Sequence, residues 1–387
     1  MNSPVDAGRV CAFAEQALPR WRRAVLKVGS SLLRGADGDL SVAHARGLAA
    51  FVAASRAQGR EVVLVSSGAV AAGRARIGAD ARGGELVLRQ ALAALGQTRM
   101  VSLWQQLLDE PVAQVLLSHD DLRNRRRYLN ARNALLELLR LRAVPVVNEN
   151  DTVAVEELKL GDNDNLAAMV ASLVDADLLL IASDVAGLYS AHPQHDPAAV
   201  AIGMVDAITP AVFAMAGGAG SAVGTGGMRT KLEAAAKAAS AGIATVLFSG
   251  VDADTVGLLA QGRFRGTRFA AAGSRLAARK VWLAQAPASG ARLRIDDGAA
   301  RALGGGASLL PGGIVAVDGE FARGDIVDVV AERDGVVRAV ARGLCQYGAG
   351  EVRRLSGRHT REIEGVLGFS YGDNVIRRDD LALLESA

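Results

Sequence analysis

The sequence has few cysteines, few aromatic residues and no long apolar run, which argues against a secreted disulfide-bonded domain, a reader of nucleic acid bases and a membrane protein. Only two of its 387 residues are cysteines, Cys11 and Cys345, and their wide separation argues against a disulfide framework. Aromatic residues make up 4% of the chain and form no stacking motif of the kind that single-stranded RNA readers use. No apolar run approaches the roughly 20 residues of a membrane helix, and the first residues lack a signal-peptide pattern. We therefore expect a globular, cytoplasmic protein with no membrane contact.

Histidine is also scarce, and the five histidines provide no convincing metal site. His192 and His195 are near neighbours, but Pro193 and Pro197 indicate a loop, and no further His or Cys lies close enough in sequence to complete a ligand shell. A solvated loop is the simpler interpretation, and we assign no metal ligands.

Two common nucleotide-binding loops are missing. The nearest approach to a P-loop, Gly68–Ala75, lacks both the lysine and the hydroxyl residue that should follow it. No Gly-x-Gly-x-x-Gly turn exists either, which excludes the usual dinucleotide fingerprint. If the protein binds a nucleotide, a different loop must hold the phosphates.

The length of the chain predicts two domains, because single cores stop growing at about 250–300 residues. From Arg23 onward, short β-branched runs alternate with longer helical patterns, which indicates an α/β domain with a mostly parallel sheet sandwiched by helices. After about Leu283, short runs separated by glycine-rich turns, such as Gly313–Val317 and Phe321–Val330, indicate a small β-rich barrel domain. The expected parts are an extension (1–22), the α/β domain (23–262), a basic linker (263–288), the β-rich domain (289–370) and a tail (371–387).

The expected linker belongs to a stretch that is rich in basic residues and free of acidic ones. Such a stripe either faces phosphates or forms a solvated hinge. Its members are Arg263, Arg265, Arg268, Arg275, Arg279, Lys280, Arg292 and Arg294.

Five expected strands of the α/β domain end in small or polar residues. Ligands of open α/β sheets bind beyond the carboxyl ends of the strands, so these residues should share one rim. Each strand and its following residues are Ala24–Val28 with Gly29-Ser30-Ser31, Glu61–Val65 with Ser66-Ser67-Gly68, Val144–Val147 with Asn148-Glu149-Asn150-Asp151, Leu178–Ile181 with Ser183-Asp184, and Thr245–Phe248 with Ser249-Gly250. Helices are expected between them over Ser41–Gly59, with Ser41 as the amino-terminal cap, and over Glu85–Leu108 and Arg127–Leu141.

A glycine-rich stretch, Gly217–Lys231, is the best candidate for phosphate binding. It ends in Gly224-Thr225-Gly226-Gly227-Met228-Arg229-Thr230-Lys231 and opens directly into a helical pattern. Glycine lets backbone N–H groups approach phosphate oxygens, and the amino end of a helix adds positive potential. The alternative is a mobile linker, but the lysine that closes the loop at the helix start favours phosphate binding.

Lys27 interrupts an apolar strand immediately before Gly29. A lysine in such a place either reaches water from an edge strand or directs its charge at the rim. The Gly-Ser-Ser sequence that follows it favours the second interpretation.

Two polar clusters, Asn148–Asp151 and Gly161–Asn165, follow further along the chain. Each alone is typical of a capped turn. Together they place four carboxylates and several amides no more than seventeen positions apart, which favours a binding shell for an amino-acid substrate. A carboxylate acceptor is already ionised at neutral pH, so phosphoryl transfer to it needs positioning and positive charge, which Lys27 and Lys231 would supply, but no general base.

Taken in order, Lys27-Val28-Gly29-Ser30, Ser66-Ser67-Gly68-Ala69, the two polar clusters and Gly224–Lys231 resemble the amino acid kinase family, and within it the enzymes that phosphorylate free glutamate. The resemblance covers the chain from about Arg23 to Leu381, because Gly319–Asp325 is similar to part of a PUA domain. The extension 1–22 matches none of these motifs.

The resemblance implies transfer of the γ-phosphoryl group of ATP, which enters with Mg²⁺, to the γ-carboxylate of L-glutamate as the first step of proline synthesis. It also implies feedback inhibition by proline and a homo-oligomer, either a dimer or a tetramer. The residues implied for catalysis are Lys27, Asp164, which would hold the lysines in place, and Lys231. Those implied for glutamate are Ser67, Asp151 and Asn163. Those implied for ATP are Lys27, Ser183, Asp184, Thr225, Gly226, Gly227, Met228, Arg229, Thr230 and Lys231.

Two alternatives remain open. Another member of the same family could act on acetylglutamate, aspartate, carbamate or a nucleoside monophosphate, but the carboxylates of Asn148–Asp151 suit a free α-ammonium group that an acylated substrate lacks. An RNA-binding or RNA-modifying protein is favoured by the basic stripe and the PUA-like tail, and the low aromatic content opposes it. RNA contact is therefore expected only as an accessory role.

Overall fold

The computed structural model describes residues 12–36, 38–77, 86–154, 163–196, 198–216, 227–273, 283–284, 288–333 and 335–384. The chain divides into two compact units, each with a hydrophobic core of its own. The first unit comprises residues 1–122 and 131–273, and the second comprises residues 123–130 and 274–387. No helix in the described residues is long and apolar enough to cross a membrane.

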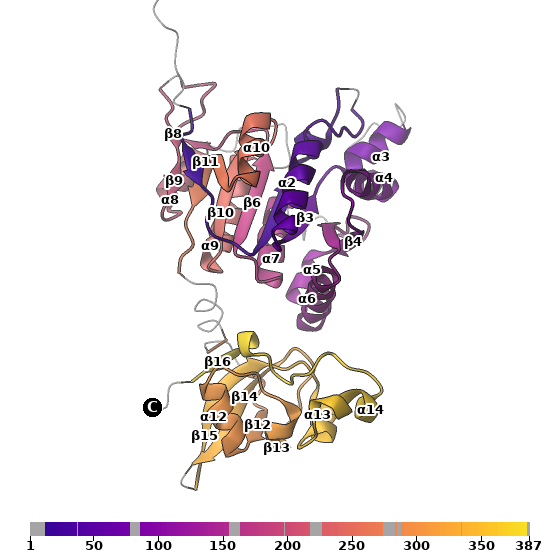
Figure 1. Cartoon of the computed structure of the whole chain (residues 1–387), viewed down its shortest axis with the longest axis vertical. Helices are drawn as coiled ribbons and strands as arrows, with labels where there is room; N and C mark the ends of the chain where they lie inside the picture. The colour runs from indigo at the N-terminus through magenta and orange to yellow at the C-terminus, as the bar shows by residue number, and fades with distance from the viewer. Residues whose placement is uncertain are drawn as a thin grey trace, which may run out of the picture. The chain divides into compact units, whose positions relative to one another are not determined.

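A nine-stranded sheet organises the described part of the first unit (Figure 1). Six strands run parallel in the order β10-β6-β2-β3-β5-β4. Their bounds are β2 (Arg23–Val28), β3 (Glu61–Ser66), β4 (Val112–Leu117), β5 (Val144–Glu149), β6 (Leu178–Ser183) and β10 (Ala244–Ser249). Beyond β10 come β11 (Arg263–Phe269), β1 (Glu15–Ala17) and β9 (Met204–Val205), and a separate pair is formed by β7 (Leu188–Tyr189) and β8 (Ala201–Ile202). The predicted mostly parallel sheet is confirmed.

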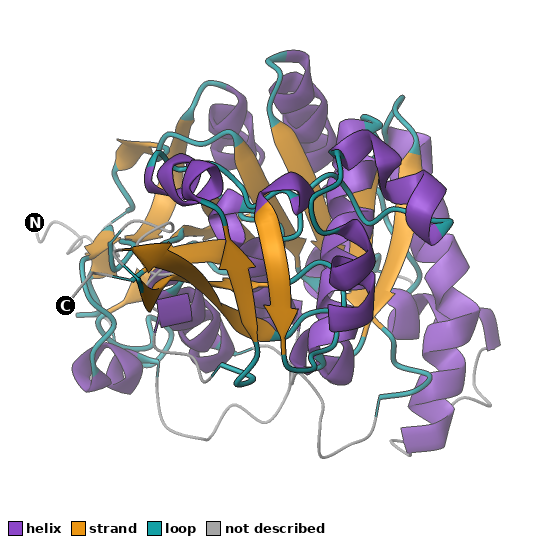
Figure 2. Ribbon diagram, turned by 90° about the horizontal axis from the view of Figure 1, so that it is seen from below, coloured by secondary structure: helices purple, strands orange, loops and turns teal. Residues whose placement is uncertain are grey.

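Helices cover both faces of this sheet (Figure 2). Their bounds are α1 (Ser30–Leu33), α2 (Ala45–Ala57), α3 (Ala69–Ile77), α4 (Leu86–Leu107), α5 (His119–Arg123), α6 (Arg125–Arg140), α7 (Asn163–Leu173), α8 (Pro210–Met215), α9 (Met228–Ser240) and α10 (Ala253–Ala260). Side chains of α2, α4 and α10 join Leu26 and Val28 of β2 in one core, while α7 and α9 pack together against the sheet. Since successive strand residues point to opposite faces, Lys27 belongs to the face of α7 and α9.

The start predicted for the helix over Ser41–Gly59 was wrong. The helix α2 begins at Ala45, with His44 in the capping position, whereas the Ser41 hydroxyl accepts a hydrogen bond from the backbone N–H of Ala43, 3.2 Å away. Ser41 therefore stabilises a tight turn that precedes the helix. The predicted end at Gly59 is confirmed, because this glycine has a φ of +75°, which suits the left-handed turn after a helix.

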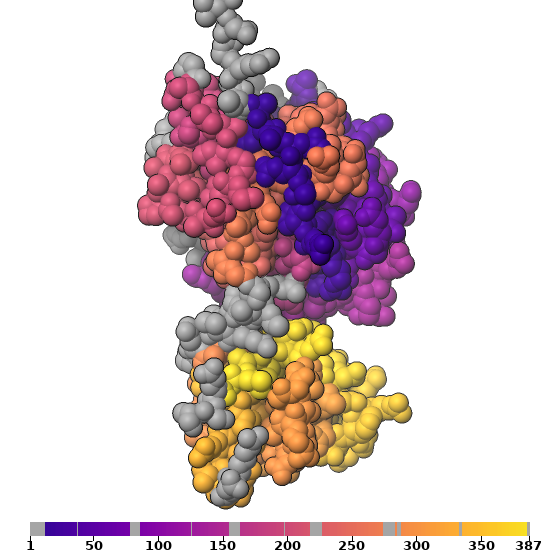
Figure 3. Space-filling model, turned by 60° about the vertical axis from the view of Figure 1, so that its left-hand side comes forward, coloured from indigo at the N-terminus to yellow at the C-terminus, as the bar shows by residue number. Residues whose placement is uncertain are grey.

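The residues expected to open the basic linker are part of the sheet instead. Arg263–Phe269 forms β11, antiparallel to β10, and β1 from the expected extension pairs with it. In the space-filling view the indigo start of the chain lies against an orange segment, in agreement with this pairing (Figure 3). Basic and apolar residues alternate at the start of this strand, where Arg263 and Arg265 are exposed and pair with Glu15 and Phe264 between them is buried. Phe269, which points to the other face, is buried as well. The basic character of the stretch is therefore that of a strand whose first residues have one solvated face.

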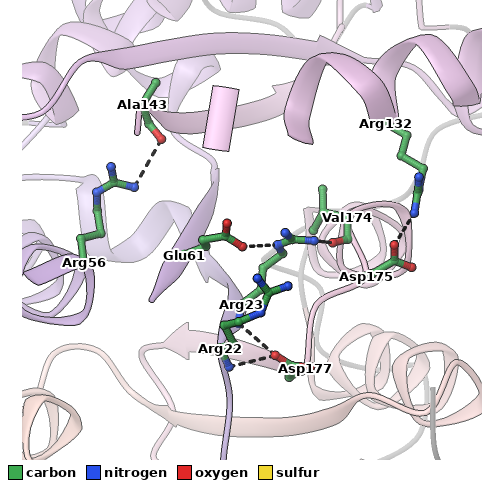
Figure 4. A network of polar contacts seen from close by, with 9 residues as sticks. All are labelled: Arg22, Arg23, Arg56, Glu61, Arg132, Ala143, Val174, Asp175 and Asp177. Carbon is green, nitrogen blue, oxygen red and sulfur yellow. Dashed lines mark hydrogen bonds and ion pairs between the residues drawn. The ribbon is translucent and has the colours of Figure 1, made fainter. Parts of the chain in front are cut away.

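Polar contacts tie the amino ends of the strands together, at the opposite end of the sheet from the polar rim (Figure 4). The Asp177 carboxylate accepts hydrogen bonds from the backbone N–H groups of Arg22 and Arg23, each 2.9 Å away. The Arg23 guanidinium pairs with Glu61 at 2.7 Å and also donates to the carbonyl of Val174. Because one arginine joins β2 to β3 and to the end of α7, the strands are held in register from this end.

The second unit contains a five-stranded sheet in the order β13-β12-β14-β15-β16. Its elements are β12 (Arg292–Ile295), α12 (Asp297–Gly304), β13 (Ile314–Asp318), β14 (Ile326–Arg333), β15 (Val336–Leu344), α13 (Ala349–Leu355), α14 (Ile363–Leu367) and β16 (Leu381–Leu383). The predicted β-rich character is confirmed, but the strand expected from Phe321 begins only at Ile326. Asp325 accepts a hydrogen bond from the N–H of Ala322, and Gly324 has a φ of +92°, so these residues form a turn.

Candidate active site

A buried carboxylate held between two lysines lies at the centre of the site. Asp164 Oδ1 lies 2.6 Å from Lys27 Nζ, and Asp164 Oδ2 lies 3.2 Å from Lys231 Nζ. Lys27 comes from β2, Asp164 from the first turn of α7 and Lys231 from the first turn of α9. All three side chains are at least nine-tenths buried. The structure therefore brings together the three residues that the resemblance implied for catalysis.

Burial and charge act in opposite directions on Asp164. Burial alone raises the pKa of this carboxyl group, but the charges and hydrogen bonds of Lys27 and Lys231 outweigh burial and hold the pKa below its usual range. The three side chains together carry one more positive than negative charge. Because an excess charge is costly in a buried place, the cluster is suited to receive the negative charge of a phosphoryl group.

The amino end of α9 contributes a second contact to the same carboxylate. The Thr230 hydroxyl lies 3.0 Å from Asp164 Oδ2 and 2.8 Å from the carbonyl oxygen of Gly227, and its single hydrogen can serve one of them at a time. Arg229 is turned to the exposed side of the helix, where it pairs with Glu233 at 3.1 Å. Thr230 and Lys231 thus point into the cluster, and the Arg229 side chain does not.

Three side-chain amides and one hydroxyl form the neighbouring part of the site. Asn163 Nδ2 donates to Ser67 Oγ at 2.6 Å and to Asn148 Oδ1 at 3.0 Å. Asn148 Nδ2 in turn donates to Gln97 Oε1 at 2.9 Å. The carboxyl ends of β3 and β5 are therefore joined to the start of α7 by one continuous chain of side-chain hydrogen bonds, which we call the amide chain (Gln97, Asn148, Asn163 and Ser67).

Asp151, Ser183 and Asp184, which the resemblance implied for glutamate or ATP, lie at or just after the carboxyl ends of β5 and β6, outside the amide chain. Asp151 stands in the turn after β5, where the N–H groups of Val153 and Ala154 bond to the carbonyl of Asn150. Ser183, which is buried, ends β6 and donates to the carboxylate of the exposed Asp184 at 3.0 Å.

Part of the expected phosphate loop falls outside the described residues. Thr225 and Gly226 lie outside the described residues. The same is true of Gly161 and Asp162 in the second polar cluster. Met228 begins α9 and is half-buried. Among the described residues, no three His, Cys, Asp or Glu side chains gather in a way that could hold a metal ion.

Three supporting residues were missed by the sequence analysis. Gln97 and Trp104 lie on the buried side of α4, where Trp104 Nε1 donates to Ser66 Oγ at 2.8 Å. Lys237 of α9 donates to Asn165 Oδ1 at 2.6 Å. A signal for Gln97 does exist, because it stands at helical spacing among Ala93, Gly96, Met100 and Trp104, where an apolar residue is expected.

The fold and the cluster define a class of protein: an α/β enzyme with paired lysines at the carboxyl rim of a parallel sheet, one of which closes a glycine-rich stretch of the sequence. In agreement with this, the model of the amino acid kinase family matches residues 22–249, and that of the PUA domain matches residues 291–367. The first match alone covers more than half of the chain. The chain therefore belongs to the amino acid kinase family.

Relatives that are similar over nearly the whole chain show which members of the family this chain resembles. A glutamate 5-kinase from Xanthomonas euvesicatoria is 61% identical over 363 residues, which cover 93% of this chain and 100% of the relative. A glutamate 5-kinase from Xylella fastidiosa is 58% identical over 375 residues, with 96% and 98% covered. The resemblance inferred from the motifs is confirmed. A solved UMP kinase from Bacillus anthracis has a TM-score of 0.45 at 14% identity, covering 65% of this chain and 97% of that one, and bears on neither substrate nor mechanism.

Proposed function

We propose that this protein is a kinase that transfers the γ-phosphoryl group of ATP to the γ-carboxylate of L-glutamate, giving L-glutamyl 5-phosphate and ADP in the first step of proline synthesis. Relatives that are named glutamate 5-kinases and are similar over nearly the whole chain support this assignment. The observation that carries it is the pair of buried lysines on Asp164, next to the amide chain.

In the proposed reaction, a side-chain oxygen of glutamate attacks the γ-phosphorus of ATP. A bond forms between that oxygen and phosphorus, the bond to the β–γ bridging oxygen breaks, and ADP leaves with the electron pair. The acceptor carboxylate is already ionised at neutral pH, so no proton has to be removed. The protein's contribution is therefore positioning and charge compensation.

Lys27 and Lys231 supply the charge compensation in this proposal. Both ammonium groups are buried and are fixed by the same carboxylate, so little reorganisation is needed when negative charge spreads over the transferring group. Asp164 is a positioning residue, which sets the separation and direction of the two lysines. ATP enters with Mg²⁺, which keeps most of its waters and supplies further positive charge on the phosphates.

The remaining implied residues divide between the two substrates. Ser67, Asp151 and Asn163 are proposed to hold glutamate, and Ser183, Asp184 and Thr225–Lys231 are proposed to hold ATP. Cytoplasmic location, feedback inhibition by proline and assembly into a homo-oligomer, a dimer or a tetramer, complete the proposal.

The test is ADP release with Mg²⁺ and ATP, comparing glutamate, acetylglutamate, aspartate and UMP as acceptors, with hydroxylamine present to trap an acyl phosphate. We expect turnover and a hydroxamate with glutamate alone. Lys231→Ala should lower kcat by on the order of a hundredfold or more, because a preorganised charge is lost. Arg46→Ala, which removes a positive charge from the exposed side of α2, is the control, and it should retain most of the wild-type kcat. Turnover with a different acceptor would overturn the substrate assignment.

A further inference from the structure

The amide chain reaches beyond the substrate-facing residues to a side chain on α4. Gln97 is 7% exposed, and its oxygen Oε1 accepts the hydrogen bond from Asn148. Among the described residues, its Nε2 group has no hydrogen-bond partner. A buried amide costs free energy unless its hydrogen bonds are made, so a glutamine in this otherwise apolar face needs an explanation.

The donors and acceptors of the amide chain can be counted. An asparagine side chain has two N–H donors and one carbonyl acceptor. Both N–H groups of Asn163 are used, one on Ser67 Oγ and one on Asn148 Oδ1. Asn163 can therefore offer a ligand only its carbonyl oxygen. Because Ser67 Oγ already accepts from Asn163, the Ser67 hydroxyl keeps its own hydrogen for a ligand acceptor.

The direction of these bonds determines which ligand groups fit. A carbonyl oxygen on Asn163 suits an ammonium group, and a hydroxyl hydrogen on Ser67 suits a carboxylate, which together match the two charged groups of an α-amino acid. If every amide turned over, Asn163 would present N–H groups instead and would oppose an ammonium group. Gln97 stands at the buried end of the amide chain and presents its acceptor oxygen to Asn148, and all the bonds that follow run in the direction that this contact begins.

We propose that Gln97 is a positioning residue that sets the hydrogen-bond direction of the amide chain and thereby selects a substrate with a free α-ammonium group. The inference rests on the proposed function, because it takes glutamate as the ligand of Asn163 and Ser67. Gln97 acts through Asn148, and no contact between Gln97 and the substrate is required.

Contacts of α4 with β3 and α3 hold the Gln97 side chain in place. About two turns further along, Trp104 Nε1 donates to Ser66 Oγ at 2.8 Å, and Ser66 immediately precedes Ser67. The same helix thus fixes both the β3 and the β5 side of the amide chain. At Gly96, next to Gln97, an added Cβ would lie 1.9 Å from the backbone oxygen of Ala69, so α4 cannot shift without moving α3.

The experiment compares Gln97→Met, which keeps the size of the side chain and removes the acceptor, with Gln97→Glu, which keeps an acceptor oxygen. Three quantities are measured: KM for glutamate, KM for ATP, and the inhibition constant of glutarate, which has both carboxylates of glutamate and no ammonium group. For Gln97→Met we expect KM for glutamate to rise about tenfold, while the other two change by less than about twofold. For Gln97→Glu we expect all three within about threefold of wild type.

Two control variants on α4 separate this role from simple destabilisation. Gln106→Met makes the same chemical change on the exposed side of the helix and should change nothing. Leu103→Ala removes buried side-chain volume and should lower Tm without separating glutamate from glutarate. A Gln97→Met enzyme with unchanged KM for glutamate, or with glutamate and glutarate weakened equally, would overturn the proposal, as would a Gln97→Glu enzyme that behaves like Gln97→Met.

Binding of glutamate to the wild-type protein, measured by calorimetry, separates the two levels of inference. If the wild type neither binds nor phosphorylates glutamate, the proposed function and the role of Gln97 both fail. If it does both and the Gln97 variants show no selective effect, only the role of Gln97 fails.

Discussion

Three consecutive residues at the start of α7 each hold a different part of the site. Asn163 bonds to Ser67 and Asn148, Asp164 bonds to the two lysines, and Asn165 accepts from Lys237 of α9. These contacts come from the first turn of one helix, so the Asn163 amide and the lysine pair cannot move independently. In the proposed reaction, this single local structure would align the phosphoryl donor and the acceptor.

Replacement of Asp164 by asparagine should destabilise the protein by about 3–5 kcal/mol, because two buried ammonium groups lose their shared carboxylate. The pKa of Asp164 is lowered in the folded state, so its contribution to stability is fully present above the unfolded value near 3.8 and is lost only as the pH falls through the lower folded pKa. We expect the difference in unfolding free energy between wild type and Asp164→Asn, measured by urea titration, to stay constant from about pH 8 to about pH 5.

A difference in unfolding free energy that changes with pH in this range would contradict this electrostatic account. If burial dominated and raised the pKa of Asp164 instead, the difference between the two proteins would already change between pH 7 and pH 5. Asp254→Asn, on an exposed residue of α10, serves as the control for the effect of removing a carboxylate.

Among single residues, the charged residues of the lysine cluster were easier to predict than the residues that hold the site in place. A lysine inside an apolar strand and a lysine at the end of a glycine-rich loop are conspicuous, and Lys27 and Lys231 do meet at Asp164. The partner of Gln97 could not be predicted, because helical periodicity shows which face of α4 is buried but not which side chain across the core lies within hydrogen-bond distance.

Among the elements, α3 and α4 pack with their backbones in contact. An ideal Cβ on Gly96 would lie 1.9 Å from the carbonyl oxygen of Ala69 and 2.5 Å from the backbone nitrogen of Gly73. Gly96→Ala should therefore destabilise the protein by about 3 kcal/mol, as measured by urea titration, because backbone atoms cannot yield as a flexible side chain can.

Gly257→Ala on α10 is the matched control for this substitution. Among the described residues, no atom outside the helix's own backbone lies within 4 Å of the added Cβ, so alanine should stabilise that helix by about 0.5–1 kcal/mol. Equal effects at Gly96 and Gly257 would show that helix propensity, rather than the close approach of α3 and α4, determines the outcome.

The strands of the first unit were predicted more accurately than the ends of helices. Buried parallel strands are continuous apolar runs, and these runs stand out in the sequence. The start of α2 was misplaced because serine is common both in caps and in turns, and only the three-dimensional hydrogen bond of Ser41 distinguishes the two. Likewise, β11 was mistaken for linker because its exposed arginines, Arg263 and Arg265, obscured the two buried phenylalanines of the same strand, Phe264 and Phe269.

In the described residues, each of the two units has a hydrophobic core of its own. The described residues that surround Asp164, from Lys27 to Lys237, all belong to the first unit. A chain that ends at Gly273 should therefore keep kcat for glutamate phosphorylation within a few-fold of the complete protein. A truncated protein that is folded by circular dichroism but inactive would show that the second unit completes the site. RNA contact by the second unit and the oligomeric state stay predictions.

The central claim is that the side-chain carboxylate of glutamate attacks the γ-phosphorus of ATP. The most direct test uses glutamate labelled with ¹⁸O in both side-chain oxygens, with hydroxylamine to cleave the product at its carbonyl carbon. The oxygen that bridges carbon and phosphorus should then leave with the phosphate, so mass spectrometry should find one ¹⁸O atom in each phosphate released. Unlabelled phosphate, formed at the same rate as ADP, would show that water rather than glutamate is the acceptor and would contradict the account.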